Sequence, residues 1–350
     1  MAVQDYKNLN LSESTGIAIR GFPLGKDHTD YILFIDRIAV GVIEAKPEGS
    51  TLSGVVEQSQ IYLTNMLNLL KDIKVKPIYA YETTGIETLF RDLRNPDTRP
   101  RRVFSFHRPE TLKEWMNIDN EENIRTLRSR LKKMEIEHHL IKEELRDCQV
   151  EAIRNLEHYF SNNRQRSLIQ MATGSGKTFT AVSFVYRLIK FSKAKRILFL
   201  VDRKTLGTQA LKEFQQYLTP DDGSKFTELY NVQHLTSNLI EPVNKVVITT
   251  IQRLYSMLSG EEEFNDESEE VSLFDKSSAS LRITEKSKQV SYNPKIPIET
   301  FDFIIIDECH RSIYNLWRQA LEYFDAFIIG LTVTPSKQTI GFFNNNPIIY

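Results

Sequence analysis

Cysteine is scarce in this chain of 350 residues, which contains only Cys148 and Cys309. Two cysteines are too few for a disulfide framework or for a zinc site built on thiolates. Long apolar runs are also missing, because no segment approaches the 18 consecutive apolar residues typical of a membrane-spanning helix. The first residues, Met1–Asp5, contain neither the basic nor the apolar part of a secretory signal. We therefore expect a cytoplasmic protein of a reducing compartment, with no membrane partner.

An excess of either charge is absent as well, since 45 basic and 46 acidic residues leave a formal net charge of −1. The chain is not a bulk polycation, so any binding to DNA must depend on local basic patches. One candidate patch is Arg99–Arg102 with Arg108, and another is the basic run between Arg125 and Lys133. The second run is more typical of a solvated, salt-bridged helix face.

The length suggests two or three domains, and the hydrophobic pattern divides the chain. Residues 1–110 read as a mixed α/β unit, in which segments 30–36 and 38–45 form a hairpin with Asp36 and Arg37 near its turn. A helix is predicted over 52–70 and a strand over 77–81. Residues 111–146 are highly charged and read as a helical connector.

Residues 147–350 alternate apolar strands with helices, which indicates a parallel sheet covered on both faces. The helix after the first strand is predicted over 179–191. The strands are predicted at 167–171, 196–201, 246–250, 303–306 and 327–331. Segment 261–297 begins with seven acidic residues in ten and has few apolar anchors, so we expect a flexible surface insertion.

A phosphate-binding loop is predicted at Ala172–Thr178, because it follows a strand and opens a helix. Gly174 and Gly176 allow backbone N–H groups to turn toward a phosphate, at the positive end of the helix dipole. Lys177 is expected to reach the β- and γ-phosphates of ATP, and Thr178 to bind Mg²⁺. The nucleotide-binding candidates in the loop are Thr173, Gly174, Ser175, Gly176, Lys177 and Thr178.

Two carboxylates, Asp307 and Glu308, follow the apolar run 303–306. Ligands bind at the carboxyl edge of a parallel sheet, where these side chains are expected. Asp307 suits a Mg²⁺ ligand, and Glu308 suits polarisation of the water that attacks the nucleotide.

A nuclease site is predicted from Asp30, Glu44 and Lys46. Glu44 and Lys46 are two residues apart on one strand and hence share a face, while Asp30 opens the neighbouring strand. Phosphodiester cleavage needs carboxylates that converge on Mg²⁺ and a cation near the attacking water. Gln58 and Tyr62 are four residues apart on the following helix and therefore share one of its faces.

These motifs resemble two known families. Glu44-Ala45-Lys46 with Gln58-x-x-x-Tyr62 is similar to the RecB-like branch of PD-(D/E)xK nucleases, and the phosphate loop and acidic box are similar to superfamily 2 motors. In that second family Gln149 would read the adenine, and His310 would relay the state of the γ-phosphate to DNA. Leu331–Pro335 resembles the motif that couples hydrolysis to movement, although Val333 replaces the usual alanine. Val201–Arg203 and Thr249-Thr250 lie where that family contacts the DNA backbone.

Taken together, the chain resembles the R subunit of Type I restriction enzymes over nearly its whole length. The resemblance implies a mixed-sheet PD-(D/E)xK nuclease domain at 1–110 and a parallel-sheet RecA-like ATPase lobe at 147–350. It also implies translocation and cleavage of unmodified double-stranded DNA with ATP and Mg²⁺, in a complex with methylation and specificity subunits. Family members begin with a helix that carries another acidic nuclease residue, for which Glu13 is an uncertain substitute, and they continue into a second lobe; we expect the chain to be a fragment.

Two other functions are compatible with the same residues. The first is a superfamily 2 repair or defence helicase with an inert nuclease-like domain. The second is a non-enzymatic module in which bound ATP only orders an interface with other subunits. Loss of Mg²⁺-dependent nicking on substitution of Lys46 would separate an active nuclease from an inert one.

Overall fold

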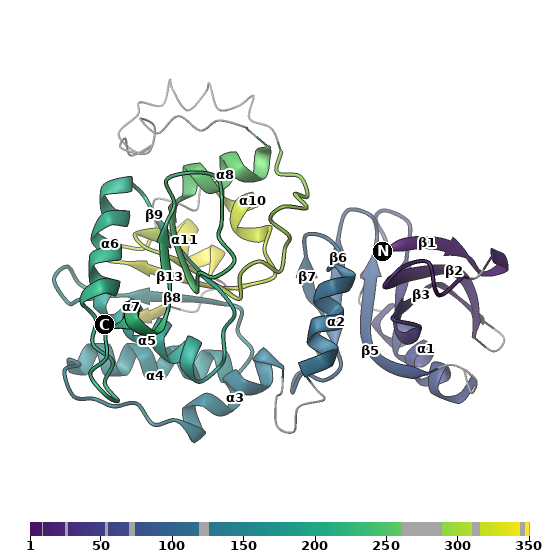
Figure 1. The fold of residues 1–350 in the computed structure, drawn as a ribbon, viewed down its shortest axis with the longest axis horizontal. Coiled ribbons are helices and arrows are strands. Elements are labelled where there is room, and N and C mark those ends of the chain that lie inside the picture. Colours follow the sequence, from purple (N-terminus) through teal and green to yellow (C-terminus); the bar gives the residue numbers. More distant parts are fainter. Residues whose placement is uncertain are drawn as a thin grey trace. The chain divides into compact units, whose positions relative to one another are not determined.

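The computed structural model describes residues 1–8, 10–24, 27–52, 55–69, 74–118, 126–260, 289–309, 316–343 and 347–349. Contacts between residues divide the chain into two compact units, Met1–Ser129 and Arg130–Tyr350. Each unit has its own seven-stranded sheet (Figure 1). The sheet of the first unit is mixed and that of the second is parallel, so the predicted α/β class and both sheet types are confirmed.

The sheet of the first unit has its strands in sequence order, from β1 to β7. Parallel pairing occurs between β1 and β2 and between β4 and β5, and the other neighbours are antiparallel. The elements are β1 (Ala2–Asp5), the 3-10 helix η1 (Tyr6–Asn8), β2 (Gly16–Leu24), β3 (Asp27–Ile35), β4 (Ile38–Ala45), α1 (Val55–Leu69), β5 (Val75–Thr83), β6 (Thr88–Asp92), β7 (Arg101–Val103) and α2 (Pro109–Ile118).

The predicted hairpin is confirmed, since β3 and β4 pair up to Ile35 and Ile38. Its two turn residues, Asp36 and Arg37, both have positive φ, of 47° and 67°. A two-residue turn with both central residues in this region matches the twist of the flanking strands. The predicted helix and the strand after it are also present, with different bounds, as α1 and β5. Strands β1, β2, β6 and β7 were not predicted.

Helix α1 packs on β4 and β5 and covers one face of this sheet. Its apolar residues Tyr62, Leu63 and Met66 join a buried cluster with Ile32 and Val42. The opposite face carries Tyr79, whose hydroxyl donates to the carbonyl oxygen of Leu112 in α2 (3.0 Å). The two helices therefore contact opposite faces of the sheet (Figure 1).

The second unit has the strand order β10-β11-β9-β12-β13-β8-β14, and every pairing in it is parallel. Helix α3 (Leu127–Glu137) spans the boundary between the units. The other helices are α4 (Asp147–Ser161), α5 (Lys177–Lys190), α6 (Lys204–Gln216), α7 (Phe226–Leu229), α8 (Ile251–Ser259), α10 (Leu316–Glu322) and α11 (Lys337–Phe342). The strands are β8 (Arg166–Gln170), β9 (Ile197–Val201), β10 (Val232–His234), β11 (Val246–Thr250), β12 (Phe303–Ile306), β13 (Phe327–Thr332) and β14 (Pro347–Ile349).

Strands β9, β11, β12 and β13 are buried along their whole length, because helices cover the sheet. None of the described helices has the length and apolar character needed to cross a membrane. Residues 261–288 of the predicted insertion lie outside the described residues. Its other end, 289–297, packs on the core: Ile296 is buried, and the Asn293 side chain donates to the Met257 carbonyl (3.0 Å). The prediction of a flexible segment was wrong for this end.

A substitution at Gly41 tests how tightly β4 and β5 pack. A Cβ added to Gly41 would lie 2.1 Å from the carbonyl oxygen of Tyr79, and backbone atoms in a paired strand cannot move aside cheaply. Gly41→Ala should destabilise the first unit by about 1–3 kcal/mol or more, measured by urea denaturation. Gly341→Ala is the control, since no atom lies within 4 Å of its added Cβ. Unchanged stability in Gly41→Ala would contradict this close pairing.

Candidate functional sites

The first candidate site lies where β3 and β4 pair in the first unit. Tyr31 pairs with Ile43, so Asp30 and Glu44 are each one residue further along antiparallel neighbours. The carboxylate Oδ2 of Asp30 accepts a hydrogen bond from the backbone N–H of Ala45 (2.8 Å). Side chains opposite each other in an antiparallel pair point to the same face. The structure therefore brings Asp30 and Glu44 together on the face that α1 covers.

Glu44 is 1% exposed, and the pKa of its carboxyl is raised to about 7. Burial is the main cause, and the neighbouring Asp30 carboxylate raises the pKa further. Lys46 acts in the opposite direction, because its Nζ lies 3.4 Å from Oε2 of Glu44. Lys46 is two residues beyond Glu44 and is held in the sheet by donating its backbone N–H to the Thr83 carbonyl (2.8 Å).

Helix α1 supplies the other two predicted residues. The Gln58 side-chain amide donates to the hydroxyl of Tyr62 (2.9 Å), as expected for residues four apart on a helix. Tyr62 is buried in the cluster between α1 and the sheet. In the described part of the chain, the Gln58 amide bonds to Tyr62 rather than to Asp30 or Glu44. Glu13 is exposed and accepts a hydrogen bond from Gln4, so the structure does not place it with these carboxylates.

The residues at this site fit a divalent cation with oxygen ligands. Oxygen Oε1 of Glu44 is buried and has no hydrogen-bond partner among the described residues. A buried carboxylate oxygen without a partner is costly unless a cation or a donor reaches it. The described residues contain no group of three or more His, Cys, Asp or Glu arranged to hold a metal. Mg²⁺ suits a pair of carboxylates, since it keeps several waters and uses one or two such ligands.

Three polar residues beside Glu44 were not identified from the sequence. Glu82 pairs with Glu44 in the parallel register of β4 and β5. Its Oε1 accepts from the Ser59 hydroxyl (2.6 Å) and from Nη2 of Arg91 (2.7 Å). No motif indicates these residues. The sequence does place one charged residue near the end of each of two apolar strands, Glu82 in β5 and Arg91 in β6. The same pattern is typical of a solvent-exposed edge of a sheet.

The second candidate site is the loop between β8 and α5 in the second unit. Gly174 and Gly176 have φ of 78° and 83°, a left-handed backbone that glycine adopts without strain. The hydroxyl of Ser175 donates to the Ala172 carbonyl (2.7 Å) and closes the turn between them. Lys177 and Thr178 are the first two residues of α5, at the helix N-terminus where phosphate is favoured.

Gln149 lies against this loop from α4. Its side-chain amide donates to the carbonyl of Ser175 (3.0 Å), and its side-chain oxygen accepts from the backbone N–H of Arg146 (2.9 Å). A Cβ on Gly176 would lie 2.5 Å from Nε2 of Gln149, so only glycine allows this approach without movement. The structure thus brings the predicted adenine-reading residue to the loop.

Two carboxylates follow β12 at the same edge of the sheet. Glu308 Oε1 lies 3.4 Å from Nζ of Lys177. The pKa of Asp307 is raised to about 6. Burial is the largest cause, the Glu308 carboxylate acts in the same direction, and Lys177 acts against both. Glu308 has a φ of 49°, a region in which a residue with a side chain costs about 1–2 kcal/mol. The residue whose carboxylate pairs with the loop lysine therefore has a strained backbone. His310, predicted as a relay, lies outside the described residues.

The other motif segments contact their neighbours as follows. Thr332 accepts from the backbone N–H of Met171 (3.0 Å), and the Gln170 amide donates to the Val333 carbonyl (3.1 Å), so the predicted coupling segment contacts the strand before the loop. Thr250 accepts from the N–H of Arg253 and caps α8. Thr249 and Thr250 are both 1% exposed, so neither side chain is open to solvent in this structure, and their contact with the DNA backbone stays a prediction.

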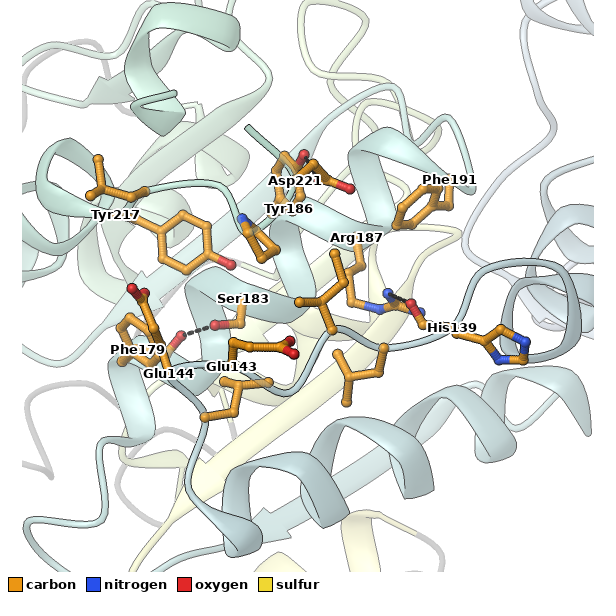
Figure 2. A pocket seen from close by; sticks show the side chains of 15 residues that line it. His139, Glu143, Glu144, Phe179, Ser183, Tyr186, Arg187, Phe191, Tyr217 and Asp221 are labelled. Carbon is orange, nitrogen blue, oxygen red and sulfur yellow. Dashed lines mark hydrogen bonds between the residues drawn. The ribbon is translucent and has the colours of Figure 1, made fainter. Parts of the chain in front are cut away.

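A pocket of about 480 Å³, its open mouth included, runs along α5, the helix that the loop opens (Figure 2). It is lined by residues 139–145 before α4, by α5, and by residues after α6. Phe179 belongs to the first turn of α5, and its ring centroid lies 5.5 Å from that of Tyr217. Burial raises the pKa of Tyr217, so this phenol stays neutral at ordinary pH.

The raised pKa of Glu44 predicts a stability that depends on pH. A carboxyl with a raised folded-state pKa contributes stability that is complete below its ordinary value of 4.5 and is lost as pH rises through about 7. At pH 8 without divalent cations, Glu44→Gln should therefore raise the unfolding temperature of the first unit by several degrees. The gain should largely disappear at pH 5, as measured by calorimetry.

The matched control for this measurement is Glu48→Gln, because Glu48 is exposed four residues further along the chain. It should leave the unfolding temperature unchanged at both pH values. An equal gain for Glu44→Gln at pH 5 and pH 8 would contradict the raised pKa.

Comparison with known proteins places these sites in a family. Residues 6–83 match the family described as the second domain of the Type I restriction enzyme EcoKI endonuclease subunit. The EcoKI endonuclease subunit of Escherichia coli K12 is 25% identical over 93% of this chain and 30% of its own length. The EcoAI endonuclease subunit of Escherichia coli is 33% identical over 54% of this chain and 19% of its own. The chain thus spans at most about a third of these two relatives.

A solved fragment from Vibrio vulnificus YJ016, described as an HsdR subunit of a type I restriction enzyme, is 23% identical. It covers 93% of this chain and 51% of that one, with a TM-score of 0.37. The resemblance to Type I restriction endonuclease subunits is therefore confirmed at the level of sequence. Residues 142–337, more than half of the chain, match the family described as the Type III restriction enzyme res subunit, and the chain belongs to that family.

Proposed function

We propose that this chain provides the nuclease and the first motor lobe of a Type I restriction endonuclease. It would translocate unmodified double-stranded DNA with ATP and cleave it, in a complex with methylation and specificity subunits. The observation that supports the proposal is that one chain holds two side-chain arrangements suited to phosphoryl chemistry, one for a phosphodiester of DNA and one for the phosphoanhydride of ATP. One is built on Asp30, Glu44 and Lys46, and the other has Lys177 paired with Glu308.

In the nuclease site, Asp30 and Glu44 would hold Mg²⁺ through their carboxylate oxygens. The cation would supply charge stabilisation for the scissile phosphate and a more acidic bound water. Lys46 is positioned to orient the attacking water, because its ammonium reaches the carboxylate that binds the cation. Gln58 and Tyr62 would orient the carboxylates from above, since α1 covers the same face.

In the motor site, the loop would bind the β- and γ-phosphates of ATP. Lys177 must then exchange Glu308 for the γ-phosphate, which leaves Glu308 able to polarise the attacking water. Asp307 and Thr178 would hold Mg²⁺. Burial raises the pKa of Asp307, and a bound cation would lower that pKa again and favour the ionised carboxylate. The adenine would be recognised by Gln149, with its apolar face toward the Phe179 end of the pocket (Figure 2).

A crossed pair of substitutions tests both sites at once. In the reconstituted complex, Lys46→Ala should abolish Mg²⁺-dependent cleavage but leave DNA-dependent ATP hydrolysis near the wild-type rate. Lys177→Ala should abolish ATP hydrolysis, and with it translocation and cleavage, because its charge stabilises the transferred phosphoryl group. Both variants should assemble normally.

Steady-state ATP hydrolysis, cleavage of circular DNA and size-exclusion chromatography measure the three properties. Wild-type cleavage in Lys46→Ala would identify the first unit as an inert nuclease fold. Unchanged ATP hydrolysis in Lys177→Ala would refute the motor site. ATP binding without turnover in the complete complex would instead favour a nucleotide that only orders an interface.

Residues 1–350 alone should bind ATP weakly and hydrolyse it negligibly, with or without duplex DNA. Lys177, Thr178, Asp307 and Glu308 all belong to a single lobe. In related phosphoryl-transfer sites an arginine from across the cleft contributes about 10³–10⁵ in rate. A coupled ATPase assay measures this, with Lys177→Ala as the control for contaminating activity. Robust DNA-stimulated turnover by residues 1–350 would contradict the need for a second lobe.

A further inference from the structure

A buried ion pair lies beside the nuclease carboxylates. Nη2 of Arg91 on β6 lies 2.7 Å from Oε1 of Glu82 on β5, with side chains 4% and 0% exposed. The same oxygen accepts from the hydroxyl of Ser59 on α1 (2.6 Å), and Nη1 of Arg91 donates to the side chain of Gln60 (3.4 Å). This cluster therefore connects two strands to the helix that carries Gln58 and Tyr62.

Stability alone does not account for this cluster. Burying two charges costs several kcal/mol per ion, and replacing such a pair with apolar residues of similar volume is often neutral or stabilising. Oxygen Oε2 of Glu82 is also buried without a hydrogen-bond partner among the described residues. Ser59 interrupts an apolar row on α1 that includes Val55, Leu63 and Met66. The free-energy cost of burying these charges is better explained if the cluster has a role in the neighbouring Asp30–Glu44 site.

The position of Glu82 relates it directly to Glu44. The two residues are partners in the parallel pairing of β4 and β5, so their Cα atoms are about 4.8 Å apart and their side chains share a face. Arg91 pairs with Ala80, and so it lies on that face one strand further on. The order across the face is therefore Asp30, Glu44, Glu82 and Arg91.

The guanidinium of Arg91 is a potential competitor of a metal ion. Arg91 lies two strands from β4 and opposite Val42 rather than Glu44, so the Cα atoms of Arg91 and Glu44 are roughly 12 Å apart. The two long side chains together can span that distance. Glu82 stands between them and binds the guanidinium. Without the negative charge of Glu82, the buried cation would turn toward the next carboxylate on the face, which is Glu44.

We propose that Glu82 is a positioning residue of the nuclease site. It holds the charge of Arg91 away from Glu44, and through Ser59 it fixes α1 over the carboxylates. Glu44 then keeps its buried Oε1 available to a divalent cation. This proposal rests on the proposed nuclease function, because it assumes that Asp30 and Glu44 bind a metal.

The test uses Mn²⁺ as the probe, titrated by calorimetry into residues 1–350 that carry Asp307→Asn to silence the motor site. Glu82→Gln should weaken Mn²⁺ binding about 10–100-fold, as expected for a residue that orients a metal ligand. The double variant Glu82→Gln/Arg91→Gln should recover most of that affinity, because the competing cation is gone. Ser59→Ala removes one bond to Glu82 and should give a smaller loss.

The matched control is a second buried ion pair on the same strand. Arg94 Nη2 lies 2.6 Å from Oδ2 of Asp92, with side chains 13% and 6% exposed. Asp92 pairs with Tyr79 and so faces α2 instead of α1. Asp92→Asn should lower the unfolding temperature as Glu82→Gln does, but change the Mn²⁺ affinity less than twofold.

Three results would overturn the proposal. The first is wild-type Mn²⁺ affinity in Glu82→Gln, and the second is an equal loss in Asp92→Asn. The third is a double variant that binds Mn²⁺ no better than Glu82→Gln, which would assign the cluster a purely structural role. If Glu82→Gln does not fold, Ser59→Ala with wild-type affinity overturns it instead. Equal Mn²⁺ binding by the wild type and Glu44→Gln would refute the nuclease site itself and this proposal with it.

Discussion

Burial of the Glu44 carboxylate is the constraint on which the first unit depends. Helix α1 covers the face that carries Glu44, and the burial that stabilises α1 also removes water from the carboxyl and raises its pKa to about 7. A buried carboxylate needs a counter-charge, and Lys46 supplies only part of it from 3.4 Å. The remaining deficit of positive charge supports the proposal that this site binds a cation.

The second unit also holds carboxylates close to its core, but a lysine of the phosphate loop supplies their counter-charge. Asp307 and Glu308 follow a strand that is buried along its whole length, so their charges also lie close to the core. Lys177 neutralises Glu308 from across the sheet edge while the phosphate loop is in the conformation described. Glu308 also has a positive φ, so the backbone is strained at the residue that pairs with the loop lysine.

Much of both sites could be predicted from local sequence, and the reason is the periodicity of strands. Asp30, Glu44 and Lys46 were assigned to one face from a two-residue period, and the phosphate loop from its glycines between a strand and a helix. The Glu82–Arg91 pair could not be found in this way, because it depends on the register between two strands, β5 and β6. The end of the insertion at 289–297 was misjudged for the same reason, since Asn293 is held by residues far away in the chain.

Raised carboxyl pKa values at both sites have a common consequence. Glu44 and Asp307, with pKa values of about 7 and about 6, are partly or largely neutralised in slightly acidic solution when no cation is bound. A cation that binds either site must displace protons, so its apparent affinity rises with pH until the carboxyl is fully ionised. The same burial that delays ionisation strengthens the interaction once a cation is bound, because the local dielectric is low. Each carboxyl thus carries its full negative charge only above its raised pKa or beside a bound cation, which limits uncompensated charge in two apolar cores in slightly acidic solution.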